Sequence, residues 1–149
     1  QLFAEQERLI AELKDLKRPL YDKLRAASPS ERVRQQVLAR AKGLDEVSGA
    51  APLSKALDVD HIVPLSEIVQ MKGFKDLSWE EQVKIVNDVR NLKAVDRSAN
   101  RSRQALSWAE DFPARKQYLQ PALEKIVVDE AKARTALQEA INAAPKAKP

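Results

Sequence analysis

The sequence contains no cysteine, which excludes disulfide bridges and zinc sites built from thiolates. Any metal ion would have to be held by oxygen atoms and imidazole, and oxygen donors favour a hard cation such as magnesium or manganese. Only three glycines occur in 149 residues. That number is low for the many turns of a β-sandwich or barrel, so the composition favours a mainly helical domain.

Long apolar stretches are also missing. No run approaches the roughly 20 residues that span a bilayer, and no signal peptide opens the chain, so we expect no membrane segment. The length suits one domain with a proper core. Because the first residue is Gln1 rather than methionine, we expect a processed product or a piece of a longer parent chain.

Apolar spacing predicts helices at both ends of the chain. Leucines recur at three- and four-residue steps over residues 2–18, and Pro19 should end or kink that helix. The Ser-Pro-Ser-Glu run at 28–31 predicts a second helix with Ser28 as its N-cap and Gly43 as its C-cap. A long helix is expected from Pro121, followed by a disordered tail.

The middle of the chain predicts two short strands separated by helical segments. Residues 57–63 are rich in β-branched side chains and precede Pro64, and residues 92–95 form the second candidate strand. A helix should follow from Arg97 to Leu106. Two serine-tryptophan pairs predict further helix starts, and we expect both tryptophans, Trp79 and Trp108, in the core.

The single histidine of the chain, His61, follows a carboxylate in the string Asp60-His61-Ile62-Val63-Pro64. Two asparagines, Asn91 and Asn100, flank the second candidate strand. Considered alone, His61 is more simply explained as a buried structural residue, and the asparagines as turn or cap residues. Their occurrence together points instead to a site.

Positive charge is concentrated beside these residues. Residues 90–103 hold five basic side chains and one acidic side chain, so this segment accounts for the whole net charge of +4. A basic run alone more often marks a solvated helix face. Next to the Asp-His pair, it suits a polyanionic substrate.

Taken together, these features resemble the HNH nuclease motif of the ββα-metal superfamily. In that family an Asp-His pair ends the first strand, an Asn precedes the second strand, and a His or Asn follows on a helix. The Asp-His-Ile-Val-Pro string and the nine-residue step between the asparagines also resemble the HNH domain of CRISPR effector nucleases. The resemblance covers roughly residues 57–106. The excursion from Pro64 to Asn91 is longer than in compact HNH domains.

The resemblance implies a role for each motif residue. Asp60 and Asn100 would be metal ligands, with Asp58 as an accessory candidate. His61 would be the general base, since a neutral imidazole suits that task near pH 7, and Asn91 would complete the catalytic set by fixing the loop and the base. Magnesium is the expected cofactor, with manganese or another divalent ion as alternatives. The expected phosphate contacts are Lys93, Arg97, Arg101 and Arg103, with Arg90 as an accessory.

The resemblance also implies an architecture. We predict one domain, residues 1–149, of mainly α class with a small ββα-metal core: two short antiparallel strands and a site helix, wrapped by N- and C-terminal helices. Its parts would be an N-terminal helical region (1–52), the HNH core (53–112) with a helical insert at about 65–90, and a C-terminal helix and tail (113–149).

The expected function is that of a metal-dependent, largely nonspecific endonuclease acting on DNA. Small HNH domains with extra helices resemble the toxin modules of secreted or contact-dependent bacterial effectors. Such a toxin would be delivered by a secretion system, would act in the cytoplasm of the target cell and would be neutralised by a cognate immunity protein. The alternatives are a phage, homing or restriction-type HNH endonuclease domain, and a non-catalytic basic helical module that binds nucleic acid.

Overall fold

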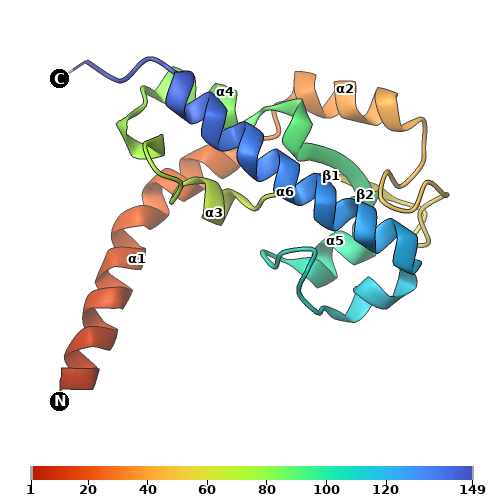
Figure 1. Cartoon of the computed structure of the whole chain (residues 1–149), viewed down its shortest axis with the longest axis horizontal. Coiled ribbons are helices and arrows are strands. Elements are labelled where there is room, and N and C mark those ends of the chain that lie inside the picture. The colour runs from red at the N-terminus through yellow and green to blue at the C-terminus, as the bar shows by residue number, and fades with distance from the viewer. Residues whose placement is uncertain (1, 149) are drawn as a thin grey trace.

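The computed structural model describes the backbone of residues 2–148, and the side chains of residues 2–3 and 9–18 lie outside the described part. The chain folds as a series of helices around one two-stranded antiparallel sheet (Figure 1). This arrangement confirms the predicted mainly α class with a small ββα core. In chain order the elements are α1 (Leu2–Ala27), α2 (Glu31–Ala41), β1 (Leu57–His61), α3 (Leu65–Ile68), α4 (Trp79–Val86), β2 (Leu92–Asp96), α5 (Arg97–Arg103) and α6 (Gln120–Ala143).

The sheet lies between helices because two strands cannot bury enough apolar surface alone. β1 and β2 pair with Asp60 opposite Lys93 and His61 opposite Leu92. One apolar cluster joins the sheet to α2 and contains Val37, Ala41, Val59, Leu92 and Ala94. A second cluster joins β2 and α5 to the start of α6 through residues that include Val95, Ala99, Trp108 and Ile126. The flanking helices therefore supply the core that holds the sheet.

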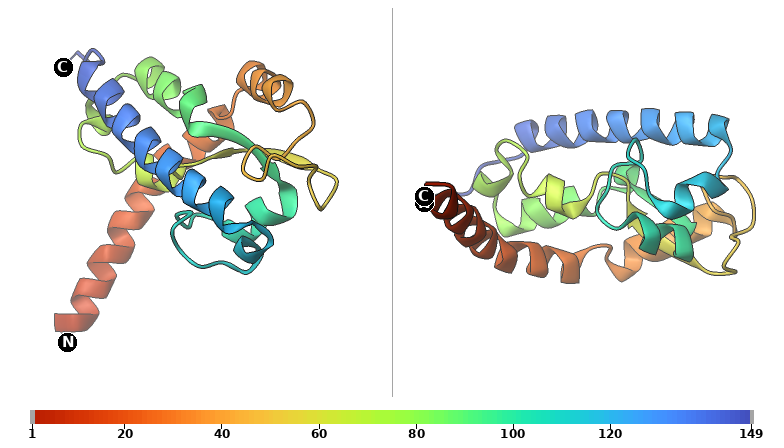
Figure 2. Two further views of the ribbon diagram at one scale, coloured as in Figure 1. Left: turned by 45° about the vertical axis from the view of Figure 1, so that its right-hand side comes forward. Right: turned by 90° about the horizontal axis from the view of Figure 1, so that it is seen from below.

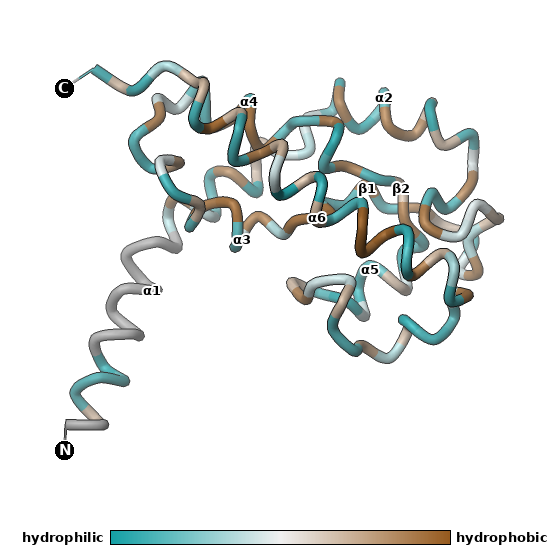
Figure 3. Tube along the Cα trace, viewed as in Figure 1, coloured by the Kyte–Doolittle hydropathy of each residue, from teal (hydrophilic) through white to brown (hydrophobic). Residues whose placement is uncertain are grey.

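α6 is a long helix that packs against two different apolar clusters along its length (Figure 2). Its first turns contribute Leu123 and Ile126 to the cluster beside the sheet. Its later turns contribute Leu137 and Ile141 to a third cluster, with Leu24 of α1 and residues of α3 and α4. Hydrophobic and hydrophilic residues alternate along α6 with the helical repeat (Figure 3), as expected for a helix with one buried face.

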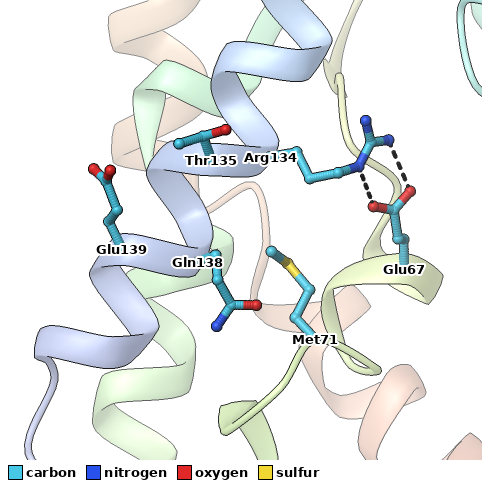
Figure 4. Close-up of a pocket in the computed structure, with 6 residues that line it drawn as sticks. All are labelled: Glu67, Met71, Arg134, Thr135, Gln138 and Glu139. Atoms are coloured by element: carbon cyan, nitrogen blue, oxygen red, sulfur yellow. Dashed lines mark hydrogen bonds and ion pairs between the residues drawn. The ribbon is translucent and has the colours of Figure 1, made fainter.

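A salt bridge ties α6 to α3 at the surface. Arg134 of α6 reaches the carboxylate of Glu67 on α3, and the two side chains line a pocket at this junction together with Met71, Thr135, Gln138 and Glu139 (Figure 4). Arg134 also lies near Glu130. Because Arg134 and Glu67 are each more than a third exposed, we ascribe the docking of α6 mainly to the apolar cluster beneath this ion pair.

The signals at two helix ends had different outcomes. Of the two alternatives for Pro19, an end or a kink, the end is excluded, since α1 continues through Pro19 to Ala27. Beyond the proline, Leu20 and Leu24 pack into the core, which offsets the roughly 3 kcal/mol that an interior proline costs. The predicted N-cap of the second helix was wrong. α2 begins at Glu31 with Ser30 as its N-cap, whose hydroxyl accepts a hydrogen bond from the Val33 amide. Ser28 is buried instead and contacts other parts of the chain.

Three smaller expectations also fail. Trp79 is exposed on α4, whereas Trp108 is buried as predicted. The segment at Ser107 forms a turn that docks on buried Glu130, with the Ser107 hydroxyl and the Trp108 amide both donating to its carboxylate. The C-terminal tail is not free: Lys146 pairs with Leu77 as an isolated bridge, and the Ala147 amide donates to the Asp76 carbonyl.

In the part of the chain that the structure describes, we find no helix with the length and hydrophobicity required to cross a bilayer.

Candidate active site

His61 is the last residue of β1, and its side chain is buried. Its Nε2 atom lies 2.7 Å from the Ser28 hydroxyl and 3.1 Å from the Val86 carbonyl oxygen, and the same hydroxyl is 2.6 Å from that carbonyl. A carbonyl oxygen only accepts hydrogen bonds. The consistent arrangement places the proton on Nε2, with Ser28 accepting from the ring and donating to Val86. The Nδ1 atom is then the unprotonated nitrogen.

The surroundings of His61 keep its ring neutral. Burial lowers its pKa to about 4, the hydrogen bond to the Val86 carbonyl opposes that shift, and the positive charge of Arg103 adds to it. A histidine in water has a pKa near 6.5. Near pH 7 the imidazole is therefore uncharged, with a lone pair available on Nδ1 for proton transfer.

The lowered pKa makes folding stability depend on pH. Between about 6.5 and about 4 the unfolded chain binds a proton at His61 and the folded chain does not, so stability is present above this window and is lost as the pH falls through it. From pH 7.5 to pH 5 we expect a loss of about 2 kcal/mol from this group. Urea denaturation at both pH values in EDTA measures the loss. The His61→Gln variant, which lacks the only histidine, should lose less, and equal losses would contradict the assigned cause.

Asp60 directly precedes His61 in β1, and both residues line one cavity. Burial raises its pKa, the charge and hydrogen bond of Arg103 lower it, and the nearby Asp58 carboxylate raises it. The Nη2 atom of Arg103 donates to the Asp60 carboxylate and, at 2.8 Å, to the His61 carbonyl. The Arg103 side chain is only 1% exposed, so its charge is available to Asp60 and not to solvent.

Asp58 and Asn100 are the other candidate metal ligands. The Asp58 carboxylate accepts a hydrogen bond from Arg97 Nε at 2.8 Å and another from Asn100 Nδ2 at 3.0 Å. Asn100 lies on α5, which begins directly after β2. The Asp96 carboxylate caps α5 by accepting from the Ala99 amide. Asp96 thus fixes where the helix starts and which residue, Asn100, meets Asp58.

Both carboxylates, His61 and Asn100 line one cavity of about 690 Å³. Alternating strand residues normally point to opposite faces, yet Asp60 and the adjacent His61 meet at this cavity because β1 ends at His61. The motif residues in its lining are Asp58, Asp60, His61 and Asn100, and the basic residues are Arg25, Arg101 and Arg103.

The basic residues predicted to contact phosphate are divided between different places. Arg101 is exposed and lines the cavity, whereas Arg97 pairs with Asp58. Arg103 also lines the cavity, but its side chain is only 1% exposed and pairs with Asp60. Lys93 and Arg90 line a different pocket: Lys93 lies 3.6 Å from Asp129 of α6, and Arg90 pairs with Asp88.

Asn91 is buried and fixes the turn after His61. Its Oδ1 atom accepts a hydrogen bond from the Val63 amide at 2.7 Å, and its Nδ2 atom donates to the Val63 carbonyl at 3.0 Å. The Asn91 carbonyl accepts from the Ile62 amide. These contacts tie the residues after β1 to those before β2.

Two contributors to the site were missed in the sequence. Ser28 and the Val86 carbonyl hold His61, although they lie 33 and 25 positions away from it. Ser28 carries a helix-start signal that conceals its role, and a backbone carbonyl has no residue-type signal at all.

The donor set suits an oxygen-preferring cation. Two carboxylates, Asp58 and Asp60, and one amide side chain, Asn100, face the same cavity, and a cation there would favour the ionised form of Asp60. Among the described residues, no three His, Cys, Asp or Glu side chains lie close enough to hold an ion by themselves. Magnesium tolerates so few protein ligands because it keeps several waters and takes others from phosphate.

A comparison with protein families matches most of the chain. Residues 10–141 match the family model of the GmrSD restriction endonucleases, C-terminal domain. None of the curated proteins or solved structures compared with this chain matches it significantly. The chain therefore belongs to the family of GmrSD restriction endonuclease C-terminal domains, which is of HNH type, and so carries an HNH-type nuclease domain.

Proposed function

We propose that this domain is a metal-dependent endonuclease that hydrolyses DNA phosphodiester bonds at the cavity of His61. The observation that carries the proposal is the neutral, buried imidazole of His61 in one cavity with Asp58, Asp60 and Asn100. The membership in a family of restriction endonuclease domains supports it.

His61 would act as the general base. Its Nδ1 atom takes a proton from a water molecule as the water oxygen bonds to phosphorus and the bond from phosphorus to one ester oxygen breaks. Ser28 and Val86 hold the Nε2–H side of the ring throughout, so Nδ1 stays directed to one position. Positioned bases of this kind accelerate such reactions by roughly 10²–10⁴-fold.

Asp60 and Asn100 would hold the divalent cation, with Asp58 as a third oxygen donor. When bound, the ion supplies Lewis-acid stabilisation for the negative charge on phosphorus oxygens and the leaving group. Magnesium is the proposed ion, since the donors are oxygen atoms. Arg103 would keep Asp60 ionised and in place.

Arg97 and Arg101 are the proposed phosphate contacts of α5. The two arginines are one helical turn apart on α5, and Asn100 lies between them in the sequence of the same helix. Contacts of this type position a nucleic acid backbone without reading its sequence.

The nature of the products tests the substrate and specificity. With magnesium, we expect an end-labelled DNA duplex of mixed sequence to give a ladder of fragments. A few discrete bands would show recognition of defined sequences, and cutting confined to RNA would contradict the proposed substrate.

Two biological roles are compatible with this activity. The family match favours a restriction-type role for the domain. The second candidate is a secreted or contact-delivered toxin neutralised by an immunity protein, favoured by the small size of the domain and by the basic segment 90–103, which accounts for its net charge. Expression of the free domain in bacterial cells distinguishes them: a toxin stops growth unless its inhibitor is co-expressed, whereas normal growth of cells with active enzyme would contradict the toxin role.

A further inference from the structure

The cavity that contains His61 is also lined by the last turns of α1. Tyr21 and Arg25 of this helix line it together with Ser28 and Pro29 of the turn that follows. Ser28 is the residue that holds His61 Nε2. The C-terminal end of α1 therefore lies beside the residues of the proposed chemistry, although no motif or spacing in the sequence indicates this proximity.

Tyr21 anchors this part of the cavity. Its ring is partly buried and packs against the apolar cluster of α1, α3, α4 and α6. Arg25, one turn later, is exposed, and its Nη1 atom lies 3.4 Å from the Tyr21 hydroxyl. An exposed cation therefore lies next to the hydroxyl of a partly buried tyrosine.

The arginines around the cavity differ in whether they form an ion pair. Arg97 pairs with Asp58 and Arg103 pairs with Asp60. Among the ion pairs of the described residues, none involves Arg25 or Arg101. The two arginines come from different helices, α1 and α5, and both line the cavity of His61. Their charge is available to an anion that enters it.

We propose that the end of α1 is part of the substrate-binding surface. Arg25 and Tyr21 bind a backbone phosphate of the nucleic acid, and Arg101 of α5 contacts the same nucleic acid. This inference rests on the proposed function, since it assigns further contacts to the same substrate. Tyr21 offers a hydroxyl and Arg25 a guanidinium, the two kinds of donor that commonly bind phosphate oxygens. α1 then has two tasks, which are to bury Leu24 in the core and to carry the phosphate contact.

Salt-dependent DNA binding tests this inference. The experiment uses the full chain with His61→Ala, so that binding is measured without cleavage, and a fluorescein-labelled duplex over a series of salt concentrations. Arg25→Gln should weaken binding several-fold and reduce the slope of log affinity against log salt by about 1, the loss of one phosphate contact. Arg25→Lys should retain most of the slope because it keeps the charge.

Lys23→Gln is the matched control. It removes the same charge from the same helix two positions away, but Lys23 does not line the cavity and lies 5.8 Å from the Trp79 ring. Binding and slope should remain those of the parent. Equal effects of Arg25→Gln and Lys23→Gln, whether both large or both absent, would overturn the proposed contact alone. A folded parent that binds no DNA at low salt would overturn the contact and the proposed function together.

Discussion

Replacing His61 with alanine is expected to reduce the rate of DNA cleavage by roughly 10²–10⁴-fold, the usual contribution of a positioned general base. The ring is neutral because burial lowers its pKa to about 4. Its Nε2 side is occupied by Ser28 and Val86, which leaves Nδ1 as the proton acceptor. The rate of nicking under single-turnover conditions, with enzyme in excess over plasmid, measures the loss.

Binding separates this effect from a general disruption of the site. The affinity of His61→Ala for a DNA duplex should stay close to that of the parent, since no phosphate contact is assigned to His61. A rate that survives the substitution would show that another group activates water. A parallel loss of affinity would show that His61 positions the substrate instead.

The second large effect is expected for Arg103→Met, which removes the buried partner of the Asp60 carboxylate, a side chain that is itself 16% exposed. Breaking a fully buried pair costs about 3–5 kcal/mol of folding stability because one charge is left buried and unpaired, and the partial exposure of Asp60 places the expected loss at the lower end of this range. Arg103 is only 1% exposed, and its Nη1 atom also donates to the Leu106 carbonyl at 2.6 Å. Urea denaturation at pH 7.5 measures the loss. The Asp60→Asn/Arg103→Met double variant should recover much of it, because no buried charge then remains unpaired.

The pH dependence of the Arg103→Met deficit identifies its cause. Burial raises the pKa of Asp60, so ionisation of this carboxyl disfavours the folded state as the pH rises above its unfolded value. Without Arg103 this penalty is larger. The deficit should therefore shrink as the pH is lowered and Asp60 takes up a proton. A deficit that does not change with pH would show that lost packing, and not the unpaired charge, is responsible.

Arg90→Met provides the matched control for this prediction. Arg90 also pairs with an aspartate, Asp88, but its side chain is 59% exposed. Exposed ion pairs contribute about 0–1 kcal/mol. A loss as large as that of Arg103→Met would contradict the importance given to burial.

The parts of the fold with local signals could be predicted from the sequence. Both strands lie close to their predicted positions, and the Ser78 hydroxyl caps α4 as its capping box predicts. Asp60, His61 and Asn100 reach one cavity because the motif carries its own geometry: a strand that ends at the histidine and a helix that starts directly after β2.

The remaining parts depend on tertiary packing that spacing does not show. Lys93 lies opposite Asp60 in the sheet but pairs with Asp129 of α6, a helix whose position cannot be inferred from the charge pattern. Arg103 and Arg101 belong to the same basic run, yet Arg103 is buried and Arg101 is exposed. The run of positive charge lies beside the candidate cavity, but the charge pattern does not distinguish an internal ion pair such as that of Arg103 from an exposed side chain such as Arg101.

If this cavity hydrolyses DNA with His61 as base and a divalent ion on its carboxylates, cleavage requires both the histidine and the ion. The most direct test is a time course of supercoiled plasmid nicking by the purified protein with magnesium, with EDTA in excess, and with His61→Ala plus magnesium. We expect nicking in the first reaction alone. Equal nicking by the parent and His61→Ala, or nicking that continues in excess EDTA, would contradict the proposed mechanism.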